Sequence, residues 1–558
     1  MGSNPTLSGF VPGTVRPAPN APVTRVMAVA WRDLSRPEQI AFWVAWAWLL
    51  GSMIHFSRFT YDDVFISLRY AENLMEGRGY TFNPGERVEG ASNPLWVWLL
   101  GACAWMRLPI LPTAKVAGGL AVLGVPWLQL GLSRALAPWR PNVVSVWLTA
   151  LAAPMAFWGV NGLETGAEAG LLLLAIVLTH RDLGRTGRIG VSAAPAWLGL
   201  ALIRPEGAGF TVPYLAVIGI AEFRRWRHGW GTLGSAIIVL GGIAALQAWR
   251  WRTFGALVPN TYWAKVANPA LFATGNGRGY LWRFLLEWGG PLLPLGAAMG
   301  AGLSWRRGRD LSALCSATVL CQVGFILLVS CDWMAGWRFM VPVWPVLALL
   351  AGSGCTALWD RVRPEGRGWR TVLVMVLAVG LAGTSARRMS RLDSAIGPNG
   401  YGPTGLHRDI GRWLKASFGS GTTLALSDAG EIPYESGLVT MDLLGLTDSY
   451  IARHSPAEGA ASVLRRAPDL IILAQGTRPK LVLGGVGGVV APLRPEDFTD
   501  VDVPRGALER ALYLAPGFSA RYRRSRVWTN SMFYDLVLYT RKGFPRQAPA
   551  GRADPYHN

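Results

Sequence analysis

Charged residues are scarce in this chain: they make up 16% of its 558 residues, against about 25% in average proteins. Hydrophobic residues make up 51%, and the mean hydropathy is +0.27. This composition excludes an intrinsically disordered protein and argues against a purely soluble enzyme. It predicts a polytopic α-helical membrane protein that has the lipid bilayer as a partner.

Cysteine is also scarce, and its placement excludes two kinds of stabilisation. All the cysteines lie in or beside apolar segments, and none falls in the long polar C-terminal region. Their spacing fits neither a disulfide framework nor a structural zinc site. The five are Cys103, Cys315, Cys321, Cys331 and Cys355.

Acidic residues are fewer than basic ones, 34 against 54, which gives a formal net charge of +20. On a soluble domain such an excess would indicate nucleic acid binding. Here many of the basic residues lie in short runs between apolar segments, as they do in the cytoplasmic loops of membrane proteins. We therefore expect no nucleic acid partner.

Apolar runs of a length that can cross a bilayer recur along the first two thirds of the chain. The first, 40–56, follows a Pro-rich tail with four arginines, which predicts an uncleaved signal anchor with its N-terminus inside. The segment 94–106 is too short to cross, and Asn93-Pro94 favours a helix start, so we expect an interfacial or re-entrant helix there. Further spans are expected at 115–133, 141–159, 165–180, 189–203, 208–222, 231–249, 282–304, 311–330, 338–357 and 370–386.

With eleven spans in this order, every predicted inner loop is rich in arginine, as the positive-inside rule requires. We therefore expect a cytoplasmic tail (1–37) and a transmembrane catalytic domain (38–386) with a large outer loop (57–114). An extracytoplasmic soluble α/β domain (387–558) follows. The expected location is the cell membrane, plasma or inner, with the site on its outer face.

Two adjacent carboxylates, Asp62 and Asp63, come just after the first span. Paired acids beside a membrane span are costly to hold there and indicate a functional site. The alternative is that Asp62 only caps a helix that begins at Asp63, since Asp is a preferred N-cap.

Other polar motifs fall on the same predicted face: NGLETG, RPEG, VPNTYWAKV and CDWMAGWRF. One ionisable residue at the edge of a span would fit helix-end chemistry or snorkelling. Five outer segments that contribute acids, bases and amides together predict a polar cleft. The candidate substrate-binding residues are Arg69, Asn83, Arg87, Glu89, Asn93, Glu164, Arg204, Glu206, Asn260, Tyr262, Lys265, Asp332, Arg338, Asp428 and Asp442.

The polar C-terminal region has β-like runs at 422–426, 470–473 and 535–539 and a helical pattern at 410–415. Its segment 427–448 has Gly and Pro at spacings typical of tight turns, which predicts loops that carry Asp428, Glu431 and Asp442. These acids have two interpretations, as site residues or as turn formers without chemistry.

These motifs together resemble the GT-C type of membrane glycosyltransferase, which takes sugars from polyprenyl-phosphate carriers, and within it the terminal arabinofuranosyltransferases. The stretch DDVFISLRYAENLMEGRGYTFNPGERVE carries most of the likeness, which extends over most of residues 55–450. The resemblance implies that Asp62 and Asp63 belong to the active site and that the extracytoplasmic domain lies beside the cleft. It implies a glycan or glycolipid acceptor of the cell envelope, and it leaves the sugar open, with a pentofuranose such as arabinofuranose as one candidate. Cys331 stands where the family pattern has glycine.

Sugar transfer from a lipid phosphate needs a base for the acceptor hydroxyl and positive charge for the departing phosphate. Asp62 or Asp63 fits the base, and two adjacent acids raise one another's pKa. Arg69 has a second interpretation, a salt bridge within its own helix. The candidates for the phosphate, in descending order, are Arg338, Arg204, Lys265 and Arg69.

A divalent cation is an open alternative, because Asp62, Asp63, Glu89 and Asp332 carry the hard oxygen ligands of calcium, magnesium or manganese. No spacing demands one, and we expect no obligatory metal. Two other functions compete with an enzyme: a transporter or flippase of a lipid-linked saccharide, and a catalytically inactive scaffold that binds glycan. Transporters place polar groups near the bilayer midplane, often in repeated halves. Polar motifs at one end of the spans favour chemistry at the membrane surface.

Overall fold

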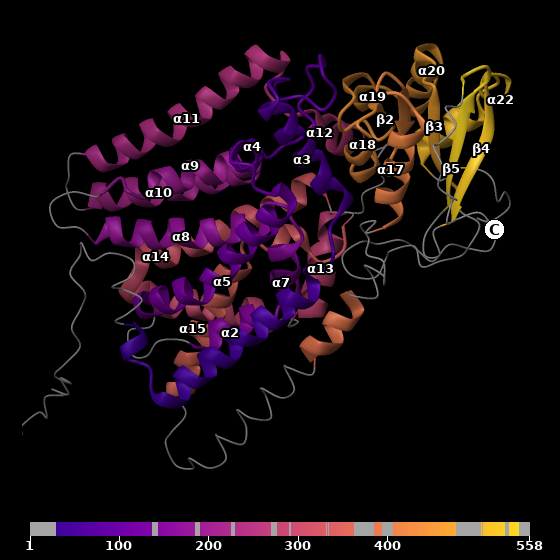
Figure 1. Cartoon of the computed structure of the whole chain (residues 1–558). Coiled ribbons are helices and arrows are strands. Elements are labelled where there is room, and N and C mark those ends of the chain that lie inside the picture. The colour runs from indigo at the N-terminus through magenta and orange to yellow at the C-terminus, as the bar shows by residue number, and fades with distance from the viewer. Residues whose placement is uncertain are drawn as a thin grey trace, which may run out of the picture.

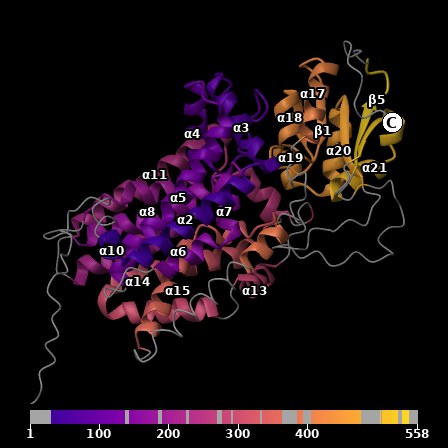
Figure 2. The same cartoon turned by 60° about the horizontal axis from the view of Figure 1, so that its bottom comes forward.

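The structure is a computed structural model with two parts, a bundle of helices followed by a domain built on a β-sheet (Figure 1). A second view shows the sheet domain at the end of the bundle that carries α3 (Asp62–Met75) (Figure 2). The described residues are 30–136, 143–184, 190–224, 229–268, 270, 276–288, 292–330, 332, 334–361, 384–392, 405–475, 504, 506–529 and 535–545.

The bundle confirms a multi-pass helical membrane protein. Among the described residues, four helices are long and apolar enough to cross a bilayer, and a bent pair would make a fifth. The four are α2 (Arg36–Phe56), α5 (Ile110–Leu136), α11 (Trp230–Phe254) and the part of α14 from Gly308 to Val329. The whole of α14 is Leu292–Val329, and the bundle also contains α8 (Thr165–Leu183), α9 (Ala194–Ile203), α10 (Gly207–Arg224), α13 (Gly277–Trp288) and α15 (Trp344–Arg361).

Two expected spans differ from continuous helices. The span expected at 141–159 is broken into α6 (Val143–Ala150) and α7 (Ala153–Val160), which meet at 65°. Pro154 lies in the first turn of α7, where its missing N–H and its ring prevent α6 from continuing. The span expected at 282–304 falls on α13 and α14, and most of the one at 370–386 lies outside the described residues.

The outer loop contains two helices and a tight turn. A helix does begin at Pro94, and α4 (Pro94–Trp105) has only 12 residues, as expected for a segment that does not cross. A tight turn lies at Asn83-Pro84-Gly85, where Glu86 N donates to Asn83 O (3.1 Å) and Gly85 has φ +87°. This is the geometry of a type II turn, in which the third residue needs positive φ.

The C-terminal domain has a five-stranded mixed sheet in the order β2-β1-β3-β5-β4. β1 (Thr423–Leu426) pairs in parallel with β2 (Val439–Asp442) and β3 (Leu470–Gln475). β5 (Asp535–Arg541) pairs antiparallel with β3 and β4 (Tyr522–Thr529). The three predicted strands are thus confirmed as β1, β3 and β5.

Helices cover both faces of this sheet. Side chains alternate between the two faces along each strand, so the apolar side chains of each face pack against their own helices. Ile410 of α17 (Leu406–Ser417) and Ile432 of α18 (Glu431–Ser436) belong to the core on one face. Val463 of α20 (Pro456–Arg466) and Leu508 of α21 (Ala507–Leu514) belong to the core on the other. The two remaining short helices are α19 (Ser449–Arg453) and α22 (Phe518–Arg521).

One contact between the sheet domain and the bundle joins α18 and β2 to α3 and to the loop after it. Arg69 of α3 donates hydrogen bonds to the carbonyl oxygens of Pro433 and Leu438, both at 2.8 Å. Asn83 donates to Thr440 O (2.7 Å) and accepts from Thr440 N (3.0 Å). Helix α3 and the loop after it are therefore held against the sheet domain.

Candidate active site

Helix α3 begins at Asp62, so both acids lie in its first turn. The N-cap position is occupied by Tyr61, whose backbone is extended and whose side chain makes no capping hydrogen bond. The alternative in which Asp62 caps a helix starting at Asp63 is therefore wrong. Carboxylates in a first turn are stabilised by the positive end of the helix dipole, which accounts for two acids at this point.

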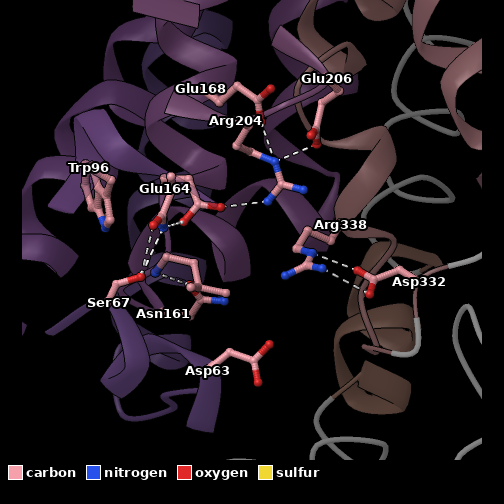
Figure 3. Close-up of polar contacts among 12 residues, drawn as sticks. Asp63, Ser67, Trp96, Asn161, Glu164, Glu168, Arg204, Glu206, Asp332 and Arg338 are labelled. Atoms are coloured by element: carbon pink, nitrogen blue, oxygen red, sulfur yellow. Dashed lines mark hydrogen bonds and ion pairs between the residues drawn. The ribbon is translucent and has the colours of Figure 1, made fainter. Parts of the chain in front are cut away.

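Asp63 lines a cavity of about 260 Å³ between the outer loop and the ends of several bundle helices. Figure 3 shows Asp63, Arg204 and Arg338 around the same space. Eight of the predicted site residues line this cavity. They come from five separate segments of the sequence. They are Asp63, Asn93, Glu164, Arg204, Glu206, Tyr262, Lys265 and Arg338.

The Asp63 carboxylate is half-buried and lies beside positive charge. Its Oδ2 atom lies 3.7 Å from Nζ of Lys265, which belongs to the π-helical turn η1 (Trp263–Ala267) after α12 (Asn260–Tyr262). Burial raises the pKa of Asp63 above its ordinary value, while the charges of Lys265 and Arg338 limit the rise. A carboxylate of raised pKa accepts a proton more readily than an exposed one.

Arg338 is fixed by a buried ion pair with Asp332. The Nε atom of Arg338 lies 2.8 Å from Oδ2 of Asp332, and Nη2 donates to Oδ1 at 3.2 Å. Arg338 begins the 3-10 helix η2 (Arg338–Met340), directly after Gly336 and Trp337, which both have positive φ. This tight turn directs the guanidinium into the cavity, while Asp332 lies behind it (Figure 3).

Arg204 is surrounded by three carboxylates. Its guanidinium lies 2.7 Å from Glu164, 2.5 Å from Glu206 and 3.3 Å from Glu168. Three carboxylates outnumber one guanidinium, so this side of the cavity is richer in acid than the side that holds Arg338 and Lys265. Asn93 links Glu164 to Ser67 by donating hydrogen bonds to both, at 2.6 Å and 3.1 Å.

Asp62 faces the sheet domain and does not line the cavity. Its Oδ1 atom accepts a hydrogen bond from the backbone N–H of Glu431 (2.9 Å), the first residue of α18. The same atom lies 3.3 Å from Nδ1 of His407, whose Nε2 lies 3.4 Å from Asp428. The predicted site residue Asp428 therefore belongs to this second cluster, on the loop after β1.

Two predicted site residues, Arg69 and Asn83, hold the sheet domain in place. Besides its bonds to Pro433 and Leu438, Arg69 donates to Phe82 O at 2.9 Å. The guanidinium of Arg69 donates to carbonyl and amide oxygens of the outer loop and the sheet domain. These contacts favour a structural role for Arg69 and Asn83, and their role as substrate contacts stays a prediction.

The remaining predicted residues also lie outside the cavity lining. Glu89 is paired through both carboxylate oxygens with Arg250 of α11. Asn260 donates to the carbonyl oxygens of Gly445 (2.7 Å) and Leu446 (3.0 Å) in the sheet domain. Arg87 is exposed on the outer loop.

Asp442 shapes a turn. It ends β2 and accepts hydrogen bonds from the backbone N–H groups of Leu444 (2.8 Å) and Thr447 (2.9 Å). The loop expected at Asp442 is thus the end of a strand, and the one expected at Glu431 is the start of α18. The turn-forming interpretation fits Asp442.

Ser67, Arg250 and His407 were missed by sequence reasoning. His407 contacts Asp62 across 345 positions of chain, and no local spacing signals such a pair. Arg250 lies near the end of an apolar helix. An arginine there is commonly one of the positive residues that flank a membrane span, so it does not indicate a site. Only Ser67 carried a signal, because it lies one helical turn after Asp63.

The described residues contain no cluster of three or more His, Cys, Asp or Glu side chains arranged to hold a metal ion. The four acids considered as ligands face different groups: Asp62 faces His407, Asp63 faces Lys265, and Glu89 and Asp332 face arginines. The arrangement does not present a preformed divalent cation site. Cys331 lies outside the described residues.

Two curated relatives share sequence with this chain, and both are named terminal beta-(1->2)-arabinofuranosyltransferase. The Corynebacterium glutamicum protein is 25% identical over 389 residues, which cover 60% of this chain and 52% of the relative. The Mycobacterium tuberculosis protein is 34% identical over 229 residues, which cover 38% of this chain and 35% of the relative. The chain thus spans about half or less of each relative's length. A family model described as a domain of unknown function (DUF8728) matches residues 399–536.

Among solved structures, the Archaeoglobus fulgidus oligosaccharyltransferase AglB is similar over 88% of this chain and 80% of its own, with a TM-score of 0.54 and 11% identity. That structure is a complex with an inhibitory peptide and a dolichol-phosphate, and another of the same enzyme is a complex with Zn and sulfate. The chain therefore has the GT-C fold of membrane glycosyltransferases. Within that class it is a distant homologue of the terminal β-(1→2)-arabinofuranosyltransferases, which confirms the resemblance that the motifs predict.

Proposed function

We propose that this protein is a membrane glycosyltransferase that moves a sugar from a polyprenyl-phosphate carrier to a glycan or glycolipid acceptor of the cell envelope. The observation that carries the proposal is the half-buried carboxylate of Asp63, which lines the same cavity as the cations Lys265 and Arg338. A base and a phosphate-binding cation are the two groups that this reaction requires.

In the proposed reaction the acceptor hydroxyl attacks the anomeric carbon of the donor sugar. A new C–O bond forms as the bond between that carbon and the phosphate oxygen breaks, and the lipid monophosphate leaves. Asp63 takes the proton of the attacking hydroxyl. Arg338 and Lys265 offset the charge of the departing phosphate, with the guanidinium able to bind two phosphate oxygens at once.

The acid-rich side of the cavity suits sugar hydroxyls better than phosphate. Three carboxylates surround Arg204, so a phosphate there would meet net negative charge. Carboxylate and amide oxygens of Glu164, Glu206 and Asn93 accept hydrogen bonds from hydroxyl groups. We assign Arg204 to holding these acceptors in place and Arg338 to the phosphate.

The site and the sheet domain lie on the outer face of the membrane in this proposal, with eleven spans across it. Support comes from the arginine-rich inner loops that this order produces. It also comes from the contacts of α3 with the sheet domain, since the two must lie on one side.

The names of the two relatives make arabinofuranose the leading candidate for the sugar. Both relatives are longer than the aligned region, and their identity to this chain is 25% and 34%. We propose a pentofuranose donor on this basis.

We also expect transfer without an obligatory metal, since arginines already pair with Glu89 and Asp332. Unchanged transfer in the presence of excess chelator is the expected result.

The test is transfer of labelled sugar from a polyprenyl-phosphate donor by the purified protein in detergent, against an envelope glycan acceptor. Formation of a new glycosidic linkage together with free polyprenyl phosphate supports the enzyme. The broken helix pair α6–α7 is a feature also found in transporters. A protein that moved the intact lipid-linked sugar across vesicles without cleaving it would be a transporter or flippase instead.

A further inference from the structure

The sheet domain touches the residue that precedes Asp63 at very close range. Glu431 N donates to the Asp62 carboxylate, and the neighbouring Gly430 leaves no room for a side chain. A Cβ atom at Gly430 would lie 2.1 Å from the carbonyl oxygen of Asp62 and 2.3 Å from its Oδ2 atom. These are far inside van der Waals contact, so the absence of a side chain at 430 is a condition of this packing.

A histidine completes the contact. His407 is buried, and its two ring nitrogens face two carboxylates, Asp62 on α3 and Asp428 on the loop after β1. A ring with a carboxylate beside each nitrogen is stabilised in its doubly protonated state. His407 therefore connects Asp62 of α3 to Asp428 on the loop after β1.

The charges around His407 favour that state. Burial alone would lower its pKa, but the hydrogen bond with Asp62 and the charges of Asp428, Asp62 and Glu431 outweigh burial and raise the pKa above its ordinary value. Glu431 is itself paired with Arg408 at 3.2 Å. The contact is therefore present when the imidazole is protonated and weakens as the pH rises through the raised pKa of His407.

We propose that Asp62 is a positioning residue through which the C-terminal domain fixes the carboxylate of Asp63 in the cavity. The two Cα atoms are one peptide unit apart, about 3.8 Å, so a rotation that releases Asp62 also displaces Asp63. This inference rests on the proposed function. It divides the acidic pair into one residue that does the chemistry and one that places it.

The first test compares Asp62→Ala, Asp62→Asn and His407→Ala in the full-length protein, with donor KM and kcat measured separately. Asp62→Ala should lower kcat by about 10- to 100-fold through misplacement of Asp63, with donor KM little changed. Asp62→Asn keeps an oxygen that can accept from Glu431 N and should retain most of the activity. Asp62→Ala and His407→Ala together should cost little more than either alone, since they break one contact.

A steric test needs no change in either acid. Gly430→Ala should lower kcat as Asp62→Ala does, because its methyl group displaces Asp62. Gly419→Ala is the matched control: it lies in the same domain, has nothing within 4 Å of the added atom, and should keep wild-type kcat. Equal kcat for Gly430→Ala and Gly419→Ala, at equal amounts of folded protein, would overturn the proposal.

The pH profile separates positioning from a merely structural role. Wild-type kcat should fall on the alkaline side as His407 loses its proton, and His407→Gln should lose that alkaline limb. An alkaline limb that persists in His407→Gln would contradict the proposal. Failure of this inference can be told apart from failure of the proposed function. Activity in Asp63→Asn would overturn the proposed function. Full kcat in Asp62→Ala together with an inactive Asp63→Asn would overturn only the positioning role of Asp62.

Discussion

Asp62 and Asp63 are consecutive, yet their carboxylates serve different parts of the molecule. Asp62 accepts a hydrogen bond from the backbone of Glu431 in the sheet domain at 2.9 Å. Asp63 lines the cavity in the bundle, 3.7 Å from Lys265. Successive side chains on a helix point about 100° apart, which is enough to place two neighbours in two environments.

Asp63→Asn should nearly abolish sugar transfer without unfolding the protein. Asn is close to isosteric but cannot accept the proton of the acceptor, so a loss of about 10²–10⁴-fold in kcat is expected. The measurement is transfer from a polyprenyl-phosphate sugar. Asp409→Asn, at an exposed acid on α17, is the control; equal activity of the two variants would remove Asp63 from the chemistry.

Arg338→Lys should keep part of the activity, and Arg338→Gln should lose more, because lysine keeps the charge but not the forked geometry. Arg338→Gln also leaves Asp332 buried without its partner, at a cost of about 3–5 kcal/mol in stability. A double variant with Asp332→Asn should therefore recover the unfolding temperature but not the donor binding. Recovery of transfer in the double variant would show that Arg338 serves only to neutralise Asp332.

Arg204→Met should destabilise the bundle strongly. Glu168→Gln should leave the unfolding temperature of the protein unchanged or raise it. Arg204 is the cation among three buried carboxylates, and its loss leaves them uncompensated, which costs about 3–5 kcal/mol. Glu168 is the most distant of the three, at 3.3 Å, and a neutral amide there reduces the excess of negative charge. Thermal unfolding in detergent measures both; an equal loss in the two variants would contradict this view of the cluster.

The sheet domain should lose stability as the pH rises from about 5 to about 8. Burial, with the charge of Asp428, raises the pKa of Glu509 to about 7 despite a hydrogen bond from Ser427. A carboxyl group whose pKa is raised on folding stabilises the fold at low pH, and this contribution disappears as the pH passes the folded pKa. Hydrogen exchange of β1 and β3 in the full-length protein reports it, and Glu509→Gln should weaken the pH dependence.

Labelling of single cysteines in a cysteine-free background tests sidedness. Cysteines at the exposed positions 85 and 421 should react with an impermeant reagent in intact cells. A cysteine at position 309, beside the kink of α14 at Gly308 and at the inner end of a span in the proposed topology, should react only after permeabilisation. Reaction of 309 in intact cells would overturn the eleven-span arrangement.

The sequence predicts the membrane class, three of the five strands and eight of the residues that line the cavity, because each has a local signal. Apolar length marks a span, β-branched and apolar runs mark buried strands, and a charged residue beside a span marks a polar site. The break between α6 and α7 also had a local signal, Pro154, which the apolar run obscured.

The separate environments of Asp62 and Asp63 have no such signal. The environment of Asp62 depends on His407, Gly430 and Glu431, which lie more than 340 positions away. The same is true of Arg69, where the sequence shows a cation near two acids and the structure supplies four carbonyl and amide oxygens from elsewhere. Long-range partners of this kind are set by the tertiary fold and not by spacing.

Arg69 binds the sheet domain through the carbonyl oxygens of Pro433 and Leu438, and Asn260 does the same with Gly445 and Leu446. A carbonyl oxygen is offered by every amino acid, so these contacts place little restriction on the side chains that the sheet domain presents. Exchange of the C-terminal domain between homologues should therefore succeed wherever its backbone path is kept and position 430 is glycine. The helical bundle can in this way retain the cavity that Asp63 lines while the sheet domain diverges in sequence.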